Sequence, residues 1–318
     1  GIKFLNIKKD KIKIINTPKL KNNLLLLPFY FFLILLLTIK SFFFIRKNNF
    51  NVLISTGGYM SIPLCISAKL LNLKIYLFEP NMVIGRANIF YMKFCEKIFC
   101  YSDKIKNFPK KYANKIIVIN SLLRKKFYSI KINEDKIKDE IKLLIIGGSQ
   151  GAKFFDQEVK DSILNLSKKY KIKVYQQSNN ENFEALKKFY NSKNIDHELF
   201  DYENNISKYI SYSNLCITRA GASTLSELTF LNVPYLAIPY PYAKDNHQYE
   251  NALFYKNQNC CWILEQNNIS SQILSNKIIQ IIENKDDYFE KKKNMKIFSY
   301  QNSWNKINEK IIKAINEN

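Results

Sequence analysis

Residues 218–252, TRAGASTLSELTFLNVPYLAIPYPYAKDNHQYENA, contain the pattern that decides the fold. The apolar run Leu215–Thr218 predicts a strand, and the small residues at 220–223 predict a turn into a helix from about Thr224. A second apolar run, Tyr235–Ile238, predicts another strand, which ends in a proline-rich loop. A strand, a helix and a second strand in this order are typical of a parallel α/β sheet.

The turn at Gly221 suits a phosphate group. Glycine lets the backbone come close to a ligand, and the N–H groups and dipole at a helix start favour negative charge. Glu227, one helical turn further along, is placed to accept hydrogen bonds from ribose hydroxyls. The alternative is that Thr224-x-x-Glu227 is only a capping box, and taken alone this segment favours that alternative.

Length and charge narrow the class of protein. A chain of 318 residues predicts two domains of ordinary size. Its 49 Lys and Arg against 27 Asp and Glu give a formal charge of +22, which indicates an anionic partner such as nucleic acid, a lipid surface or a phosphorylated substrate. Lys, Asn and Ile are abundant throughout, as expected from an AT-rich genome, and this accounts for part of the charge. No RNA-binding aromatic signature or zinc-finger spacing occurs, so we expect no nucleic-acid partner.

Cysteine and histidine usage argues against a metal site. The six cysteines lie mostly in apolar segments without metal-ligand spacing, which favours a reduced, cytosolic chain with buried thiols. His197 and His247 are the only histidines, which excludes a His-rich site. We therefore expect no cofactor and no tightly bound metal.

Leu24–Ile45 is the strongest hydrophobic run, and it is nearly long enough to cross a bilayer. Pro28 and Lys40 interrupt it, and basic residues flank it at 8, 9, 11, 13, 19 and 21 and at Arg46 and Lys47. No small-residue cleavage site follows, which disfavours a signal peptide. We predict a helix that lies partly on the domain and partly in the lipid interface, with its basic rim on anionic headgroups. A spanning helix and a buried core helix are the alternatives.

Strand-like and helix-like runs alternate along the whole chain. The first half predicts strands at 12–15, 51–55, 74–78, 97–101 and 115–119. The polar stretch 131–142 predicts an interdomain linker, and a second series follows with strands at 142–146, 172–176, 197–200, 215–218, 235–238 and 261–264. Two helices, 271–284 and roughly 303–315, are predicted to close the chain.

Two doubly wound halves predict a ligand cleft, because open α/β sheets bind ligands beyond the carboxyl ends of their strands. Two further glycine turns follow predicted strands there, Thr56-Gly57-Gly58-Tyr59-Met60-Ser61 and Gly147-Gly148-Ser149-Gln150-Gly151-Ala152. Neither is a P-loop or a G-x-G-x-x-G fingerprint. A single such turn can serve helix–strand packing alone, whereas three in tandem α/β domains favour phosphate binding.

At this level of detail the chain resembles the MurG family, whose members transfer N-acetylglucosamine (GlcNAc) from UDP-GlcNAc to lipid I. The matching segments occur in the family's order and spacing: TGGYMS at 56–61, FEPN at 78–81, IIGGSQGA at 145–152, RAGASTLSE at 219–227 and DNHQYENA at 245–252. The resemblance implies a GT-B fold, in which two Rossmann-like domains face a cleft. It implies an inverting hexosyltransferase that makes lipid II for peptidoglycan synthesis, bound peripherally at the cytoplasmic face of the bacterial inner membrane.

The resemblance also implies site residues. Donor binding is assigned to Asn81, Arg124, Ser149, Gln150, Ser223, Thr224, Glu227, His247, Gln248 and Asn251. The acceptor diphosphate is assigned to Gly57, Gly58, Tyr59 and Ser61. We expect an acceptor- and membrane-associating domain at 1–130, a linker at 131–142, a UDP-GlcNAc-binding domain at 143–298 and a C-terminal helix at 299–318.

The chain departs from the family pattern around the catalytic base. The family's N-terminal Gly-Gly-Thr-Gly-Gly-His loop has no counterpart, so the first domain is expected to be truncated, either as a fragment or by real loss. Glu79 is the remaining carboxylate near the expected cleft and a weak candidate for the base. Alternatives are another GT-B transferase with a lipid acceptor, such as diacylglycerol, and a non-catalytic UDP-sugar-binding remnant.

Overall fold

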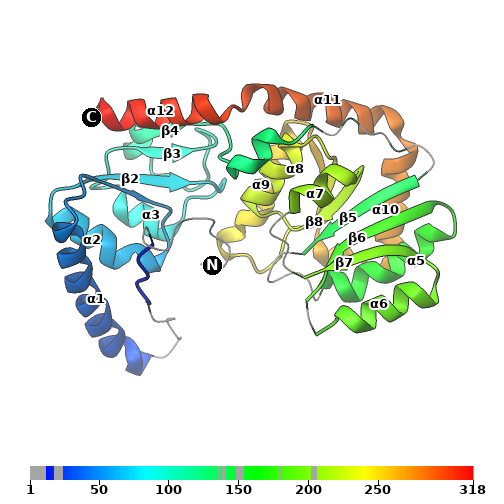
Figure 1. The fold of residues 1–318 in the computed structure, drawn as a ribbon, viewed down its shortest axis with the longest axis horizontal. Coiled ribbons are helices and arrows are strands. Elements are labelled where there is room, and N and C mark those ends of the chain that lie inside the picture. The colour runs from blue at the N-terminus through cyan, green and yellow to red at the C-terminus, as the bar shows by residue number, and fades with distance from the viewer. Residues whose placement is uncertain are drawn as a thin grey trace. The chain divides into compact units, whose positions relative to one another are not determined.

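The computed structural model describes residues 12–17, 24–132, 134, 137, 140–147, 154–179, 181–201 and 206–317. The chain divides into two compact units (Figure 1). The first unit comprises Gly1–Ile119 and Ile311–Asn318, and the second comprises Asn120–Lys310. Each unit is built on its own parallel sheet, as the alternating pattern predicts.

The sheet of the first unit has the order β1-β2-β3-β4, with all neighbours parallel. Its strands are β1 (Val52–Ser55), β2 (Lys74–Glu79), β3 (Ile98–Cys100) and β4 (Ile116–Val118), which confirms four predictions. The strand predicted at 12–15 is wrong, because residues 12–17 form no strand. Its alternating Lys and Ile mimic a strand, but a strand also needs a partner for its backbone groups. Among the described residues, β1 pairs with β2 alone.

Helices cover both faces of this sheet. One face packs against α1 (Leu27–Lys47), α2 (Ile62–Leu70) and α3 (Arg86–Tyr91), which lie together in Figure 1. On the other face the rings of Tyr76 and Phe99 stack with centroids 5.9 Å apart. The Tyr76 hydroxyl donates to the carbonyls of Ala314 and Ile315 in α12 (Trp304–Asn316), so the end of the chain belongs to this unit.

The sheet of the second unit has the order β10-β9-β8-β5-β6-β7 and is also parallel. Its strands are β5 (Glu140–Ile146), β6 (Lys171–Gln177), β7 (Asp196–Phe200), β8 (Leu215–Thr218), β9 (Tyr235–Ala237) and β10 (Cys261–Ile263), which confirms the second series. The strand order reverses between β5 and β8, where Ile146 pairs with Thr218. This reversal is the place where open α/β sheets bind ligands.

Two layers of helices bury the second sheet. One face carries α5 (Lys160–Ser167), α6 (Phe183–Ser192) and α10 (Ser271–Glu283). The other face carries α7 (Ile206–Tyr212), α8 (Ala222–Phe230), α9 (His247–Asn257) and α11 (Lys285–Gln301). Burial on both faces explains why strands such as β8 are apolar throughout rather than alternating.

Four helices end in the same way, with an asparagine in the left-handed conformation. The φ angles of these asparagines lie between 52° and 60° at Asn72, Asn194, Asn232 and Asn259, after α2, α6, α8 and α9. In each case the next residue donates to a carbonyl five positions earlier, as Leu73 does to Ala68. These are Schellman motifs with asparagine in the place usual for glycine, and each leads directly into a strand.

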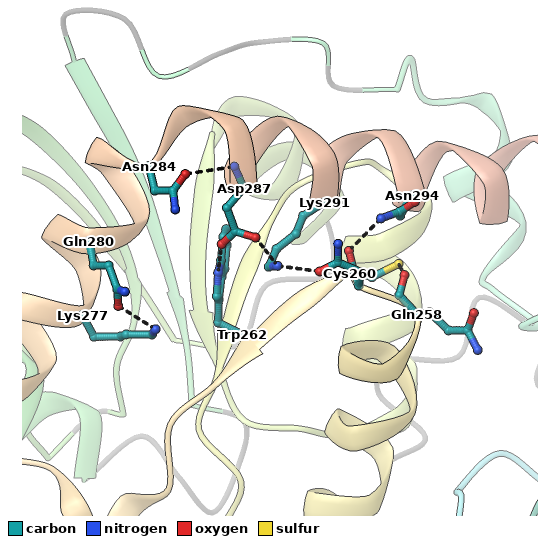
Figure 2. Close-up of polar contacts among 10 residues, drawn as sticks. Gln258, Cys260, Trp262, Lys277, Gln280, Asn284, Asp287, Lys291 and Asn294 are labelled. Atoms are coloured by element: carbon teal, nitrogen blue, oxygen red, sulfur yellow. Dashed lines mark hydrogen bonds and ion pairs between the residues drawn. The ribbon is translucent and has the colours of Figure 1, made fainter.

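Helix α11 was absent from the prediction, which placed two helices after residue 271 instead of three. Lys291 is 4% exposed, and its Nζ donates to Asp287 Oδ1 and Asn259 Oδ1, each at 2.8 Å. Figure 2 shows Asp287 between Lys291 and Trp262, whose Nε1 donates to Asp287 Oδ2 at 2.7 Å. The helix therefore packs through polar groups and lysine stems as well as through Tyr288 and Met295, and apolar periodicity does not reveal the polar part.

The boundary between the units differs from the predicted one. The first unit ends at Ile119, whereas the prediction extended the first domain to residue 130. Leu123 and Phe127 are 4% and 0% exposed and belong to the core of the second unit. The predicted linker 131–142 overlaps the start of β5 at Glu140. The range 299–318, predicted as a C-terminal helix, is shared between the two units. Residues up to Lys310 belong to the second unit and residues from Ile311 onward to the first.

Candidate functional site

The start of α8 lies at the carboxyl end of β8 and has a glycine as its N-cap. Gly221 is extended, with φ −69°, and has no side chain to accept from the first-turn N–H groups. Ser223 is exposed and Thr224 half-buried within that first turn. The capping-box alternative is therefore wrong, because Thr224 lies inside the helix rather than at its cap. The helix start presents backbone donors suited to an anion.

Glu227 and Arg124, both predicted to bind the donor, contact each other in the second unit. Arg124 Nε donates to Glu227 Oε1 at 3.1 Å, and Nη2 lies 2.9 Å from the same oxygen. Glu227 is 7% exposed, and this burial raises its pKa although the Arg124 charge opposes the rise. The Arg124 side chain is 43% exposed and rests over the Phe127 ring. A buried carboxylate and a more exposed guanidinium thus lie together beside α8.

Gln248 and Asn251 support the Gly221 turn from α9. Gln248 Oε1 accepts from the backbone N–H groups of Ala220 at 3.2 Å and Tyr240 at 3.0 Å. Asn251 Nδ2 donates to the Ala220 carbonyl at 3.2 Å. The two side chains therefore fix the backbone directly before Gly221 and join the ends of β8 and β9.

His247 begins α9 after a strained loop. Asp245 and Asn246 both have left-handed backbones, with φ of 54° and 55°. The His247 Nδ1 atom lies 2.8 Å from the Lys244 carbonyl oxygen, which orients the ring. Consecutive left-handed residues other than glycine are costly, and such strain is concentrated at functional sites.

Arg219 is a charged residue of this site that the sequence interpretation missed. It is 6% exposed, and its guanidinium donates to the carbonyls of Ile238 and Pro239 and to Gln266 Oε1 at 3.1, 3.3 and 2.6 Å. Burial lowers its pKa to about 10, so it remains a cation at neutral pH. No carboxylate in the described part of the chain forms an ion pair with it. The sequence feature that could have identified Arg219 is its position between an apolar strand and a glycine turn.

Positive groups gather at the carboxyl edge of β8, where the Glu227 carboxylate offsets the charge of Arg124. The positive end of the α8 dipole lies directly after Gly221, and the buried Arg219 lies two residues before it. The Arg124 side chain contacts Glu227, one turn into α8. Such an edge suits the diphosphate of a sugar nucleotide. Ser149 and Gln150, predicted in the neighbouring glycine turn after β5, lie outside the described residues.

The predicted acceptor turn of the first unit follows β1. Gly57 and Gly58 have φ of 80° and 78°, a conformation that favours glycine. Ser61 Oγ donates to the Gly58 carbonyl at 2.7 Å and to the Tyr91 hydroxyl at 3.2 Å, and Tyr59 begins the 3-10 turn Tyr59–Ser61. The four predicted residues therefore form one turn in front of α2.

Glu79 and Asn81 lie at the carboxyl end of β2 in the same unit. Glu79 is 3% exposed, and both of its carboxylate oxygens accept hydrogen bonds from neighbouring N–H groups. Asn81 is one of these donors, through its backbone and its side chain. The candidate base is therefore a buried hydrogen-bond acceptor at the end of β2.

Helix α1 presents its polar and apolar faces in the reverse of the usual sense. Its buried residues include Thr38 and Ser41, and the Thr38 carbonyl accepts from Ser67 of α2. Large apolar residues point away from the unit, with Phe31 72% and Phe43 63% exposed. Among the described residues α1 is the one helix long and apolar enough to cross a membrane.

Comparison with known sequences assigns both halves of the chain. Residues 142–307 match the glycosyltransferase family 28 C-terminal domain, and residues 3–100 match the N-terminal domain of that family. A Pelagibacter ubique (strain HTCC1062) protein is 55% identical over 318 residues, covering 100% of this chain and 89% of the relative. It is described as UDP-N-acetylglucosamine–N-acetylmuramyl-(pentapeptide) pyrophosphoryl-undecaprenol N-acetylglucosamine transferase. A Rickettsia canadensis (strain McKiel) protein of the same description is 37% identical over 238 residues, 74% of this chain and 67% of its own length.

Solved structures agree on the fold. The crystal structure of Acinetobacter baumannii MurG superposes with a TM-score of 0.75 at 20% identity, covering 98% of this chain and 86% of that one. A UDP-GlcNAc 2-epimerase from Neisseria meningitidis, bound to UDP-GlcNAc, superposes with a TM-score of 0.59 at 12% identity, covering 88% and 81%. Both likenesses concern the two-domain α/β architecture alone.

Proposed function

The chain belongs to the MurG family within glycosyltransferase family 28, and from this membership we infer that it transfers GlcNAc from UDP-GlcNAc to lipid I. The product is lipid II, a precursor of peptidoglycan. The observation that carries this function is 55% identity along the whole chain to a relative of that activity, together with both family domains. The chain is thus an N-acetylglucosaminyltransferase of GT-B fold.

We propose that the donor binds at the carboxyl edge of β8. In this arrangement Glu227 accepts from the ribose hydroxyls, and the diphosphate lies at the start of α8 beside Ser223 and Thr224. Support comes from the glycine N-cap of α8 and from the burial of Glu227 next to that helix turn. Ser149 and Gln150 remain predicted diphosphate contacts.

Arg124 is proposed to neutralise the charge that develops on the diphosphate as UDP leaves. It is held 2.9 Å from Glu227, so one short movement of an exposed side chain brings it from the carboxylate toward the phosphates. Arg219 and the α8 dipole add fixed positive potential at the same edge. Charges that are already oriented before reaction stabilise a leaving group most effectively.

The sugar is proposed to contact Asn81, His247, Gln248 and Asn251. In Gln248 the Oε1 atom already accepts from two backbone N–H groups, so the Nε2 group is the part that donates to a sugar hydroxyl. Gly57, Gly58, Tyr59 and Ser61 are proposed to approach the acceptor diphosphate through the turn before α2.

We propose further that α1 lies in the lipid interface, on the cytoplasmic face of the plasma membrane. Its outward Phe31 and Phe43 side chains would enter the acyl boundary, while Lys40, Arg46 and Lys47 meet anionic headgroups. The acceptor is a lipid, so a peripheral anchor on the first unit brings the acceptor turn to its substrate. The described part of the basic N-terminal flank is Lys13, whose Nζ lies 6.0 Å from the centre of the Phe44 ring.

The deciding experiment is a transfer assay with radiolabelled UDP-GlcNAc and lipid I in detergent micelles. We expect labelled lipid II, and a Glu227→Ala variant that loses donor affinity. Glu283→Ala is the matched control, because Glu283 also pairs with a basic side chain but is exposed on α10. Transfer to diacylglycerol rather than lipid I, or UDP binding without transfer, would contradict the proposed function.

A further inference from the structure

Glu79 ties several parts of the first unit together. Its Oε1 accepts from the Asn81 backbone N–H at 3.2 Å and from Asn81 Nδ2 at 3.0 Å. Its Oε2 accepts from the Gly85 N–H at 2.8 Å and from Asn88 Nδ2 at 2.9 Å. One buried carboxylate therefore receives four N–H donors from three residues.

Asn88 continues this arrangement from α3 to the glycine turn. It is 1% exposed, and because its Nδ2 faces the carboxylate, its Oδ1 points the other way. Within the described residues that Oδ1 has no hydrogen-bond donor. A Cβ added to Gly57 would lie 2.6 Å from Asn88 Oδ1, so the amide fills the space directly beside the turn. Asn88 is thus packed between Glu79 and Gly57.

This geometry is poorly suited to a general base. A base needs a carboxylate lone pair within reach of the hydroxyl whose proton it removes. Each Glu79 oxygen already accepts two N–H groups, and the side chain is 3% exposed. Accepting a proton would require those hydrogen bonds to break. Positioning the residues that follow β2 is the role that uses all four hydrogen bonds to Glu79.

We propose that Glu79 is a positioning residue that, with Asn88, fixes the sugar-contacting Asn81 loop and the acceptor turn at Gly57 and Gly58 in one mutual arrangement. The two substrate-binding segments of the first unit then share a single buried anchor. This proposal rests on the proposed function for the roles of Asn81 and Gly57, whereas the anchor itself is a property of the free protein.

The anchor is tested first without substrate, by hydrogen exchange at the backbone amides of Asn81 and Gly85. Glu79→Gln keeps the shape but replaces one acceptor oxygen by an NH₂ group, which opposes the donors on that side. Hydrogen bonds to charged groups are strong enough that we expect exchange to accelerate at least about tenfold. Glu96→Gln, an exposed glutamate of the same unit, is the control and should leave both amides unchanged. Unchanged exchange in Glu79→Gln would overturn the anchor.

Kinetics then separate positioning from base catalysis. Positioning predicts that Glu79→Gln and Asn88→Ala both raise KM for UDP-GlcNAc and lipid I about tenfold, while the shape of the kcat–pH profile is retained. A base predicts that Glu79→Gln lowers kcat by about a thousandfold at unchanged KM and flattens the profile, with Asn88→Ala near wild type. That second pattern would overturn the proposal. If the wild-type protein transfers no GlcNAc to lipid I, the proposed function fails, and amide exchange alone decides on the anchor.

Discussion

Gly57 and Gly58 have nearly the same φ but different environments, and this difference allows a test at the scale of single residues. A Cβ at Gly57 would meet Asn88 at 2.6 Å, whereas a Cβ at Gly58 would meet nothing within 4 Å. Both substitutions to alanine place a Cβ on a backbone with φ near +80°, which is strained for an L residue. We expect Gly57→Ala to lower the free energy of unfolding by about 1–3 kcal/mol more than Gly58→Ala, as overpacking does. Urea denaturation of the two variants measures the difference.

The same measurement in an Asn88→Ala background completes the comparison. Removing the amide removes the obstacle, so the gap between Gly57→Ala and Gly58→Ala should shrink to within about 0.5 kcal/mol. A gap of the same size in both backgrounds would show that Asn88 is not the cause.

Glu227, the residue proposed to bind the ribose, should lower the stability of the fold through its buried charge. Burial raises its pKa, with the Arg124 charge opposing the rise. When the pKa of a carboxyl is higher in the folded than in the unfolded state, the fold becomes less stable as the pH rises from the unfolded-state pKa through the folded-state pKa. At pH 7 its charge therefore destabilises the fold. We expect Glu227→Gln to have a higher Tm than wild type at pH 7 and an equal Tm in acid.

The same variant should bind UDP-GlcNAc at least about tenfold more weakly, because a hydrogen bond to a charged acceptor is lost. Isothermal titration at pH 7 provides this value. Glu283→Gln serves as the control, because hydrogen bonds from Lys169 and Tyr170 lower the pKa of the exposed Glu283, the opposite direction. A variant that is both less stable and unimpaired in binding would refute the assignment.

The sequence predicted residues that belong to a recognisable motif. It did not predict residues whose importance depends on their contacts in the folded chain. Glu227 was predicted from its place one turn into the helix after Gly221, and Gln248 was implied by the resemblance to the MurG family. Gln248 Oε1 accepts from Ala220, directly before that turn. Arg219 and Asn88 were not predicted, because their importance depends on burial against segments distant in sequence. A buried polar side chain is recognisable only once its surroundings are known.

At the scale of elements, the Schellman asparagines offer a stability prediction. Asn72 and Asn194 are exposed and left-handed, with φ of 55° and 52°. Glycine adopts this conformation without a Cβ penalty, so we expect Asn72→Gly and Asn194→Gly each to raise the free energy of unfolding by about 0.5 kcal/mol. Asn191→Gly, inside the last turn of α6, is the control and should lower it. Thermal denaturation of the three variants decides, and a loss at Asn72 and Asn194 would contradict the argument.

Helix α11 should contribute stability that depends on pH. Burial alone raises the pKa of Asp287, but hydrogen bonds from Lys291 and Trp262 outweigh it and lower the pKa below its ordinary value. Such a group stabilises the fold above its unfolded pKa, and this contribution is lost as pH falls through the folded pKa. We expect Asp287→Asn to lose about 1 kcal/mol at pH 7, allowing for solvent screening, and nothing in strong acid. A deficit independent of pH would contradict the ion pair as its source.

Most strands were predictable because they are short runs rich in apolar residues, and β3, β8 and β9 are buried at every position. Ten strands, from Val52–Ser55 to Cys261–Ile263, match predicted runs to within a few residues. The errors came where pattern and burial disagree. Residues 12–15 have a strand pattern without a partner, and α11 has partners without an apolar pattern.

At the scale of the whole molecule, the proposed attachment to lipid rests on the outward face of α1. Phe31→Ser with Phe43→Ser removes two exposed rings, so we expect partitioning onto vesicles containing anionic phosphatidylglycerol to fall at least about tenfold. Phe289→Ser, a partly exposed ring on α11 of the second unit, should leave partitioning unchanged. Cosedimentation measures binding, and high salt should weaken the wild-type interaction. Retention in the membrane after carbonate washing would instead indicate a spanning helix.

Composition predicted two domains, and the chain has two units, but it could not locate their boundary. Polarity marked 131–142 as a linker, while the chain already joins the second unit at Asn120. Leu123 and Phe127 decide this through their burial in the second core, which a local pattern does not report.

The asparagines that end four helices have a consequence for the codon composition of the gene. Asparagine codons consist mainly of A and T, whereas every glycine codon begins with two G bases. Of the eight glycines, seven lie at 57, 58, 85, 147, 148, 151 and 221. Among the described ones, Gly58 and Gly221 are helix N-caps and Gly85 donates to Glu79. Mutational pressure toward A and T can replace glycine wherever asparagine adopts the same backbone. Gly57 is a position where such a replacement is blocked, because a Cβ there would lie 2.6 Å from Asn88 Oδ1.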